Sequence, residues 1–174
     1  MIAYNSYVAD GFVYMPFFVG PHEHGHPMLN ANDGFYSQFI YVVHGSGSYH
    51  IRDTEDGDET GTALPAVGQL LNISENYEKF HCIEAGENGA GLVFFNPIPA
   101  TQDLAIELLE SGSSHTVTAT DKNKTVVCIS GPISIGGGDI GKSLVAHQHA
   151  KVKPGQSFTV SIPDHSVAVI VTVA

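Results

Sequence analysis

Short apolar runs, broken every few residues by glycine, proline or acidic residues, follow one another along the chain. Runs of this length with alternating apolar and polar positions indicate β-strands. Strands are expected at residues 11–20, 36–44, 47–53, 62–73, 79–85, 90–96, 115–120, 124–130, 143–152, 157–162 and 166–173. Asp56-Gly57 and Asn88-Gly89 are pairs that favour two-residue hairpins, because glycine accepts a positive φ. The pattern predicts an antiparallel all-β sandwich or barrel.

One segment predicts a short helix instead. Thr101 can cap it, Gly112 can end it, and the apolar residues between them are Leu104, Ile106, Leu108 and Leu109. The helix separates residues 1–112, expected to form a first β domain, from residues 113–174, expected to form a second β lobe.

The composition and charge of the chain argue against several classes of function. The chain has 18 acidic and 7 basic residues, a formal net charge of −11, and Arg52 as its single arginine. It offers no basic surface to nucleic acids or anionic membranes, and it disfavours phosphate substrates. It has no apolar run long enough to span a membrane and no signal-peptide pattern, so we expect a cytoplasmic protein. Cys82 and Cys128 form no disulfide framework and are expected to be buried as small apolar residues.

Ten histidines outnumber the basic residues, and three of them, His22, His24 and His26, lie within five residues. On an extended segment His22 and His24 project from the same face. Two imidazoles on one face can bind one divalent transition metal, although a third ligand must come from a neighbouring strand. Gly25 and Pro27 break regular geometry, so His26 need not follow the same face.

The next strand carries a more specific pattern. His22-x-His24 is followed, after a gap, by the polar residue Gln38 and then by Phe39-Ile40-Tyr41-Val42-Val43-x-Gly45-x-Gly47. This arrangement resembles the first motif of the cupin superfamily. In that family the position of Gln38 usually holds a metal-binding glutamate.

The segment Pro65-Ala66-Val67-Gly68-Gln69-Leu70-Leu71 resembles the turn and strand of the second cupin motif, and His81 is the best match for the third metal-binding histidine. The resemblance covers roughly residues 11–96. Residues 113–174 are similar to the metal-free C-terminal lobes of pirin-like bicupins. The resemblance implies an antiparallel cupin-type β-barrel or jelly roll at residues 1–112 and a second cupin-like lobe without metal ligands. The alternative is one barrel extended by the strands of residues 113–174.

Three arrangements of the site remain open. In the first, His22, His24 and His81 form a three-histidine centre that resembles the thiol-dioxygenase branch of cupins, with Gln38 coordinating weakly or orienting water. In the second, His26 replaces the missing ligand. In the third, no metal is bound.

The resemblance implies a metal-dependent enzyme that acts on a small molecule, with an oxygenase-type reaction favoured over an isomerase or lyase reaction. Iron is the favoured metal, and zinc, nickel or manganese are alternatives. Gln38 and Tyr41 are the candidate catalytic residues, with Tyr36 beside the approach. We expect a homo-oligomer, such as a homodimer. The rival hypotheses are a metal-free small-molecule binding module and a structural assembly protein. His50 is expected to be structural or exposed, and residues 53–59 to form a solvated hairpin tip.

Overall fold

The structure is a computed structural model of the chain, and it describes residues 5–27, 38–54, 56–74, 79–137 and 140–173. The chain divides into two compact units: unit 1 comprises residues 1–8 and 13–96, and unit 2 comprises residues 9–12 and 97–174. After the short segment 9–12, the chain passes from unit 1 to unit 2 between residues 96 and 97, and the domains at residues 1–112 and 113–174 stay a prediction. Among the described residues there is no helix with the length and apolar character that crossing a membrane requires.

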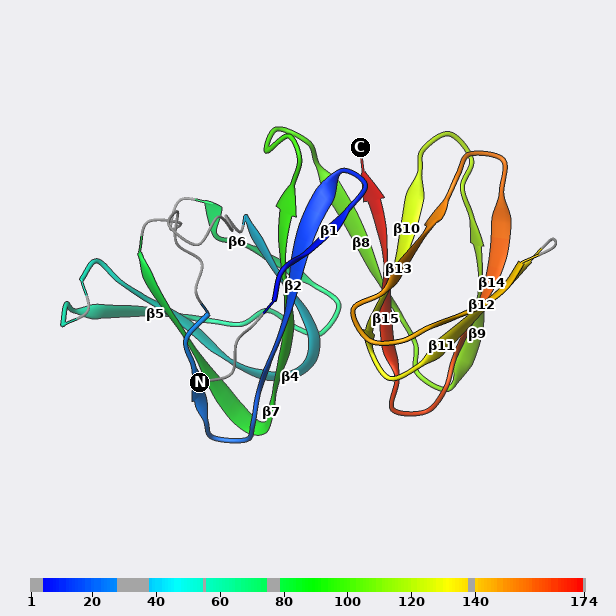
Figure 1. Cartoon of the computed structure of the whole chain (residues 1–174). Helices are drawn as coiled ribbons and strands as arrows, with labels where there is room; N and C mark the ends of the chain where they lie inside the picture. Colours follow the sequence, from blue (N-terminus) through cyan, green and yellow to red (C-terminus); the bar gives the residue numbers. More distant parts are fainter. Residues whose placement is uncertain (1–4, 28–37, 55, 75–78, 138–139, 174) are drawn as a thin grey trace. The chain divides into compact units, whose positions relative to one another are not determined.

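Unit 1 is built on one seven-stranded antiparallel sheet (Figure 1). The strand order is β1-β2-β7-β4-β5, while β3 pairs with β7 and β6 pairs with β4. The strands are β1 (Tyr7–Ala9), β2 (Phe12–Val19), β3 (His24–Gly25), β4 (Phe39–Arg52), β5 (Glu59–Ala63), β6 (Leu70–Asn72) and β7 (Phe80–Pro97).

The core of unit 1 lies on one face of the long β4–β7 pair. Tyr49 stands opposite Ile83, and both belong to this core. We call this the inner face, and we call the opposite face, which carries Ser48 and Glu84, the outer face. The other buried members of the core are Met15, Phe17, Val19, Ile40, Val42, Ile73, Ala85, Ala90, Leu92 and Phe94. Phe17 and Phe94 meet edge to face at 5.7 Å between ring centroids, a favourable aromatic geometry.

The two longest strands replace pairs of shorter ones that the sequence predicted. Residues 36–44 and 47–53 were expected as separate strands, but β4 runs from Phe39 to Arg52. Likewise β7 passes through Asn88-Gly89 without a hairpin. Gly45 pairs with Ala90 and Gly47 with Ala85, so the residues between Ala85 and Ala90 form an irregularity in the ladder. The turn-forming pair therefore marks a bulge, the other use of such residues in a strand.

The hairpin between β4 and β5 also differs from the expected two-residue turn. With Asp56-Gly57 as a two-residue turn, the residues on either side of the turn would pair with each other. Counting outward from that pair would place Arg52 opposite Gly61. In the structure Arg52 pairs with Glu59, and His50 pairs with Gly61. A longer connection is used, in which the N–H of Gly57 donates to the carbonyl oxygen of Thr54 at 3.1 Å.

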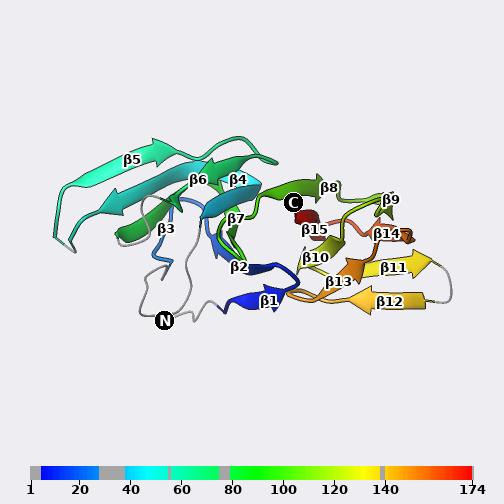
Figure 2. The same cartoon turned by 90° about the horizontal axis from the view of Figure 1, so that it is seen from above.

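Unit 2 is a sandwich of two four-stranded antiparallel sheets, with orders β13-β10-β15-β8 and β12-β11-β14-β9. Figure 2 shows β11 and β12 side by side and running in opposite directions. The strands are β8 (Leu104–Leu109), β9 (Ser113–Thr118), β10 (Lys124–Ser130), β11 (Ile133–Gly137), β12 (Ile140–Leu144), β13 (His149–Val152), β14 (Ser157–Ile162) and β15 (Val167–Val173). Strand β14 alternates strictly between exposed and buried residues, as expected when only one face of a sheet is buried.

The predicted helix is wrong: β8 occupies its position. Its burial alternates, with Leu104, Ile106 and Leu108 half-buried and the two residues between them exposed. This two-residue period fits a strand better than a helix stripe, and β8 completes a sheet edge by pairing with β15. The gain from sheet pairing and burial outweighed the helix propensity of the leucines.

Candidate functional site

The predicted metal ligands His22, His24 and His26 lie at the connection that leads from β2 through β3. His22 has a φ of 56°, and its N–H donates to the carbonyl oxygen of Gly86 at 3.2 Å. His24 opens β3, where it pairs with Glu84 of β7. All three histidine side chains are exposed.

His81, the expected third ligand, lies on the other side of the sheet. It pairs with Ile51, two residues along β4 from Tyr49, so alternation places it on the inner face. His24 stands opposite Glu84 and therefore shares the outer face. The sheet separates the imidazoles of His24 and His81.

The two predicted catalytic residues are also apart from His81. Gln38 immediately precedes β4, and its N–H donates to Phe95 near the end of β7, whereas His81 is near the start of β7. Tyr41 is buried but alternates with the core residues Ile40 and Val42, so it points to the face opposite the core. Tyr36 lies outside the described residues.

The expected three-histidine centre is therefore not assembled. The described ranges contain no group of three or more histidine, cysteine, aspartate or glutamate side chains that could hold a metal ion. His26, the alternative ligand, is exposed and belongs to no metal-holding group among the described residues. Within the described part of the chain, His24 and His81 therefore do not fit one metal centre of the kind that the cupin resemblance implies.

What the inner face does hold is a buried polar pair. The hydroxyl of Tyr49 lies 2.7 Å from Nδ1 of His81, and the two rings stack with centroids 5.8 Å apart. The His81 residue is only 5% exposed, and its Nε2 is buried without a hydrogen-bond partner. Burial lowers the pKa of His81 from 6.5 to about 4, because the charged imidazolium loses its hydration. His81 is thus a neutral imidazole near pH 7.

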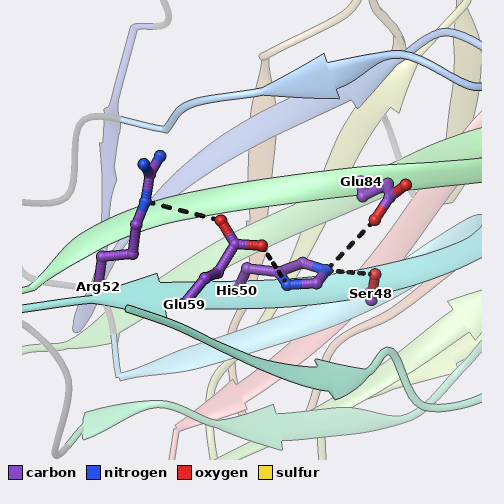
Figure 3. Close-up of polar contacts among 5 residues, drawn as sticks. All are labelled: Ser48, His50, Arg52, Glu59 and Glu84. Atoms are coloured by element: carbon purple, nitrogen blue, oxygen red, sulfur yellow. Dashed lines mark hydrogen bonds and ion pairs between the residues drawn. The ribbon is translucent and has the colours of Figure 1, made fainter. Parts of the chain in front are cut away.

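The outer face holds a second polar cluster that the sequence did not predict (Figure 3). His50 contacts Ser48 through Nε2 at 2.6 Å and Glu59 through Nδ1 at 2.7 Å. Glu84 lies 3.5 Å from Nε2, and Arg52 lies 3.6 Å from Glu59. The alternation of Ser48, His50 and Arg52 along one strand indicated a shared face. The contact between His50 and Glu59 could not be predicted from the sequence, because it depends on the register of the β4–β5 hairpin.

The two carboxylates of this cluster do not converge on one point. Glu59 contacts Nδ1 and Glu84 lies beside Nε2, so their oxygens are at different edges of the imidazole ring (Figure 3). This arrangement orients the ring rather than forming a cation site.

The cysteines behave as expected from the sequence. Cys82 and Cys128 are both buried free thiols. Burial raises the pKa of Cys128 to about 11 and also raises that of Cys82. Thiols with a raised pKa are poor nucleophiles, because little thiolate is present at neutral pH.

Comparison with known proteins finds similar folds among solved structures. No protein-family model and no curated protein matches the chain. Among solved structures, YhaK from Escherichia coli aligns with 97% of this chain and 92% of its own, at 11% identity and a TM-score of 0.54. AerE from Microcystis aeruginosa aligns with 98% and 91%, at 10% identity and a TM-score of 0.55. A cupin 2 conserved barrel domain protein from Leptotrichia buccalis aligns with 99% and 88%, at 12% identity and a TM-score of 0.45.

The likenesses to YhaK and AerE show a shared fold alone, and they agree with the antiparallel all-β architecture that the sequence predicts. At such identities the fold is shared, while activity has to be argued from the side chains of this chain.

Proposed function

We propose that unit 1 is a binding module for a small, uncharged molecule, which it recognises through His81 without a metal. The observation that carries this proposal is the unpartnered Nε2 of His81, buried on the inner face of the sheet. A buried polar atom left without a partner costs roughly 1–3 kcal/mol. A ligand oxygen that bonds to Nε2 would remove this cost, which supports the proposal.

Tyr49 orients the imidazole ring of His81. Its hydroxyl bonds to Nδ1, which fixes the imidazole ring and leaves Nε2 as the free polar atom. If the hydroxyl donates to Nδ1, the proton of the neutral ring is on Nε2, which then donates to a carbonyl or hydroxyl oxygen. The neighbouring inner-face residues Ile51 and Ile83 are apolar. This combination of apolar surroundings and one polar anchor is typical of small-molecule sites.

The charge of the ligand follows from the charge of the anchor. With a pKa of about 4, His81 offers no positive charge to an anion at neutral pH. An ionised ligand on an apolar inner face would lose its hydration without a counter-ion. The favoured ligands are therefore uncharged molecules with one hydroxyl or carbonyl group.

The metal-dependent oxygenase hypothesis makes a different demand on the same histidine. It needs His22, His24 and His81 to bind one ion, whereas the strand pairing puts His24 and His81 on opposite faces of the sheet. The two hypotheses therefore differ in metal content and in the role of His24.

The test combines metal analysis with thermal shift measurements on protein purified without a histidine tag. We expect less than stoichiometric transition metal, even after reconstitution with iron or zinc. Among medium-chain alcohols, ketones and the matching alkanes, we expect an alcohol or ketone, but not its alkane, to raise the melting temperature. His81→Phe should abolish this shift, whereas His24→Phe, a matched change on the outer face, should retain it.

Two outcomes would contradict the proposal. An equal thermal shift in native protein and His81→Phe would show that binding does not use Nε2. Stoichiometric metal that is lost in both His24→Ala and His81→Ala would instead support a metal-dependent enzyme.

A further inference from the structure

The outer-face cluster is formed where three strands bring their side chains together. Ser48 and His50 are two residues apart on β4 and therefore share a face. Glu59 comes from β5, where it stands opposite Arg52, and Glu84 comes from β7, where it stands opposite Ser48. Figure 3 shows the side chains of Ser48, Glu59 and Glu84 directed toward the imidazole of His50.

The contacts of His50 arrange its proton and its lone pair. An ionised carboxylate only accepts hydrogen bonds, so Nδ1 carries the proton that it donates to Glu59 across 2.7 Å. In the neutral imidazole, Nε2 then has a lone pair, which accepts the hydroxyl proton of Ser48 across 2.6 Å. A hydroxyl bonded to a base that is itself oriented by a carboxylate is the arrangement of an activated nucleophile.

The ring is also held in place by the strand beside it. His50 is opposite Gly61 of β5, and a Cβ at Gly61 would come within 2.7 Å of the imidazole ring. The side chain of His50 is only 17% exposed, as expected for a ring packed against a backbone. Arg52 lies 3.6 Å from the second oxygen of Glu59 and opposes rotation of that carboxylate away from His50.

Unit 2 contains a similar Ser-x-His pair that lacks this arrangement. On β9 the hydroxyl of Ser113 lies 2.6 Å from Nε2 of His115, at the same two-residue spacing. The Ser113 hydroxyl also donates to the carbonyl oxygen of Glu110, so its proton is directed away from the imidazole. Within the described ranges, no ion pair joins His115 to a carboxylate. The spacing alone therefore does not produce the geometry seen at Ser48.

From these contacts we propose that Ser48, His50 and Glu59 form a nucleophilic triad that hydrolyses small esters bearing a positively charged amine. Ser48 is the nucleophile, His50 is the general base and Glu59 is a positioning residue. This activity goes beyond the proposed binding of uncharged molecules and uses the opposite face of the sheet.

The preference for a cationic ester follows from Glu84. Its carboxylate lies 3.5 Å from Nε2 of His50 and is 52% exposed, so it can contact a substrate that approaches Ser48. A negative charge beside the nucleophile repels an anionic ester and attracts an ammonium group. The net charge of −11 acts in the same direction at longer range. Glu84 also stabilises the imidazolium that develops on His50 during attack.

The proposed reaction proceeds in two balanced steps. First, Ser48 Oγ bonds to the ester carbonyl carbon while its proton passes to Nε2 of His50. The ester C–O bond then breaks, and the leaving alcohol takes that proton. In the second step water attacks the acyl-Ser48, giving a proton to His50. The acyl–Oγ bond breaks, the carboxylic acid leaves, and Ser48 recovers its proton. One ester and one water become one acid and one alcohol.

The solvent exposure of the triad indicates how fast ester hydrolysis should be. A positioned general base contributes roughly 10²–10⁴-fold to a reaction rate. Ser48 is half-buried and His50 is partly exposed, so water reaches the reacting atoms. We therefore expect slow turnover, with activated esters reacting fastest.

The first test is covalent labelling of the full chain with a fluorophosphonate probe, followed by peptide mass spectrometry. Ser48 Oγ should form the bond to phosphorus with loss of fluoride, and Ser48→Ala should abolish the label. The matched control Ser113→Ala should label as the native protein does. No labelling of the native protein, or undiminished labelling of Ser48→Ala, would overturn the proposal. Circular dichroism establishes that each variant is folded.

The second test measures substrate preference. Hydrolysis of acetylcholine, which is cationic, is compared with that of p-nitrophenyl acetate and of the anionic p-nitrophenyl hydrogen succinate. Glu84→Gln should lower the preference for the cationic over the anionic ester by about tenfold, which corresponds to one close charge interaction of about 1.4 kcal/mol. An unchanged preference in this variant would contradict the assigned substrate class.

The role of Glu59 needs a measurement that a merely structural residue would not affect. Glu59→Gln should lower the labelling rate at least tenfold and shift its pH profile, because a neutral amide no longer stabilises the imidazolium. Glu59→Asp should restore part of the rate. Gly61→Ala should also slow labelling, by displacing the imidazole ring. Identical pH profiles for native protein and Glu59→Gln would rule out the positioning role.

Discussion

At the scale of single residues, His81 combines burial with an unpartnered ring nitrogen. It is a buried histidine on an apolar face, with one ring nitrogen bonded to Tyr49 and the other without a partner. The sequence predicts His81 as a metal ligand, whereas we propose that it binds a small molecule through a hydrogen bond. The order of residues could not reveal that Tyr49 reaches its Nδ1, because the two are 32 positions apart and meet only through strand pairing.

The lowered pKa of His81 predicts a pH-dependent stability. With a pKa of about 4 in the folded protein and about 6.5 unfolded, the unfolded chain binds more protons between these values. The free energy of unfolding should therefore fall as pH decreases from 6.5 to 4, by about 3 kcal/mol for the full shift. Urea unfolding of native protein and His81→Phe checks this, since the variant should lack that part of the decrease. An identical pH dependence in both proteins would refute the assignment, and His24→Phe should behave as the native protein does.

At the scale of elements, the β4–β7 pair decides which side chains meet. Its inner face carries Tyr49 and His81, and its outer face carries Ser48, His50 and Glu84. Alternation along β4 could be predicted from the sequence, because it is a local property of an extended chain. The register with β5 and the bulge in β7 could not, because several pairings satisfy the same two-residue period.

The close approach of β4 and β7 at their bulge gives a test of this element. Gly45 has a φ of 71°, and a Cβ there would lie 2.0 Å from the carbonyl oxygen of Gly89. Gly45→Ala should lower the free energy of unfolding by more than about 2 kcal/mol, through backbone strain and a steric clash. Denaturant unfolding measures the change. Gly141→Ala is the matched control: no atom lies within 4 Å of its added Cβ, so it should change stability by about 0.5 kcal/mol or less. Equal effects at both positions would contradict the observed strand contact.

At the scale of the whole molecule, the excess of acidic residues affects the stability of the fold through charge repulsion. With a net charge of −11 and only seven basic residues, the acidic side chains far outnumber their possible basic partners and repel one another. The described ion pairs neutralise a few of them, such as Lys79 with Asp53 and Lys151 with Asp10. Self-repulsion therefore works against folding, and it depends on how strongly salt screens the charges.

We expect the melting temperature at pH 7.5 to rise between about 10 mM and 150 mM sodium chloride, because the Debye length shortens from roughly 30 Å to 8 Å. The double variant Asp56→Asn, Asp58→Asn removes two exposed charges from the β4–β5 connection, so it should respond less to salt. Differential scanning calorimetry measures both responses. A melting temperature that falls or stays constant as salt is added would show that net repulsion is not a significant destabilising force.

The sequence by itself determined the all-β class, the cupin resemblance and the burial of both cysteines. These follow from local alternation, motif spacing and apolar surroundings, which the chain carries wherever it folds. Tertiary structure decided that residues 104–109 form a strand, because pairing with β15 supplies contacts that an isolated segment lacks. It also decided which polar groups meet. His24 and His81 lie on opposite faces, while Glu59 reaches His50, because face and register are set by the packing of the whole sheet.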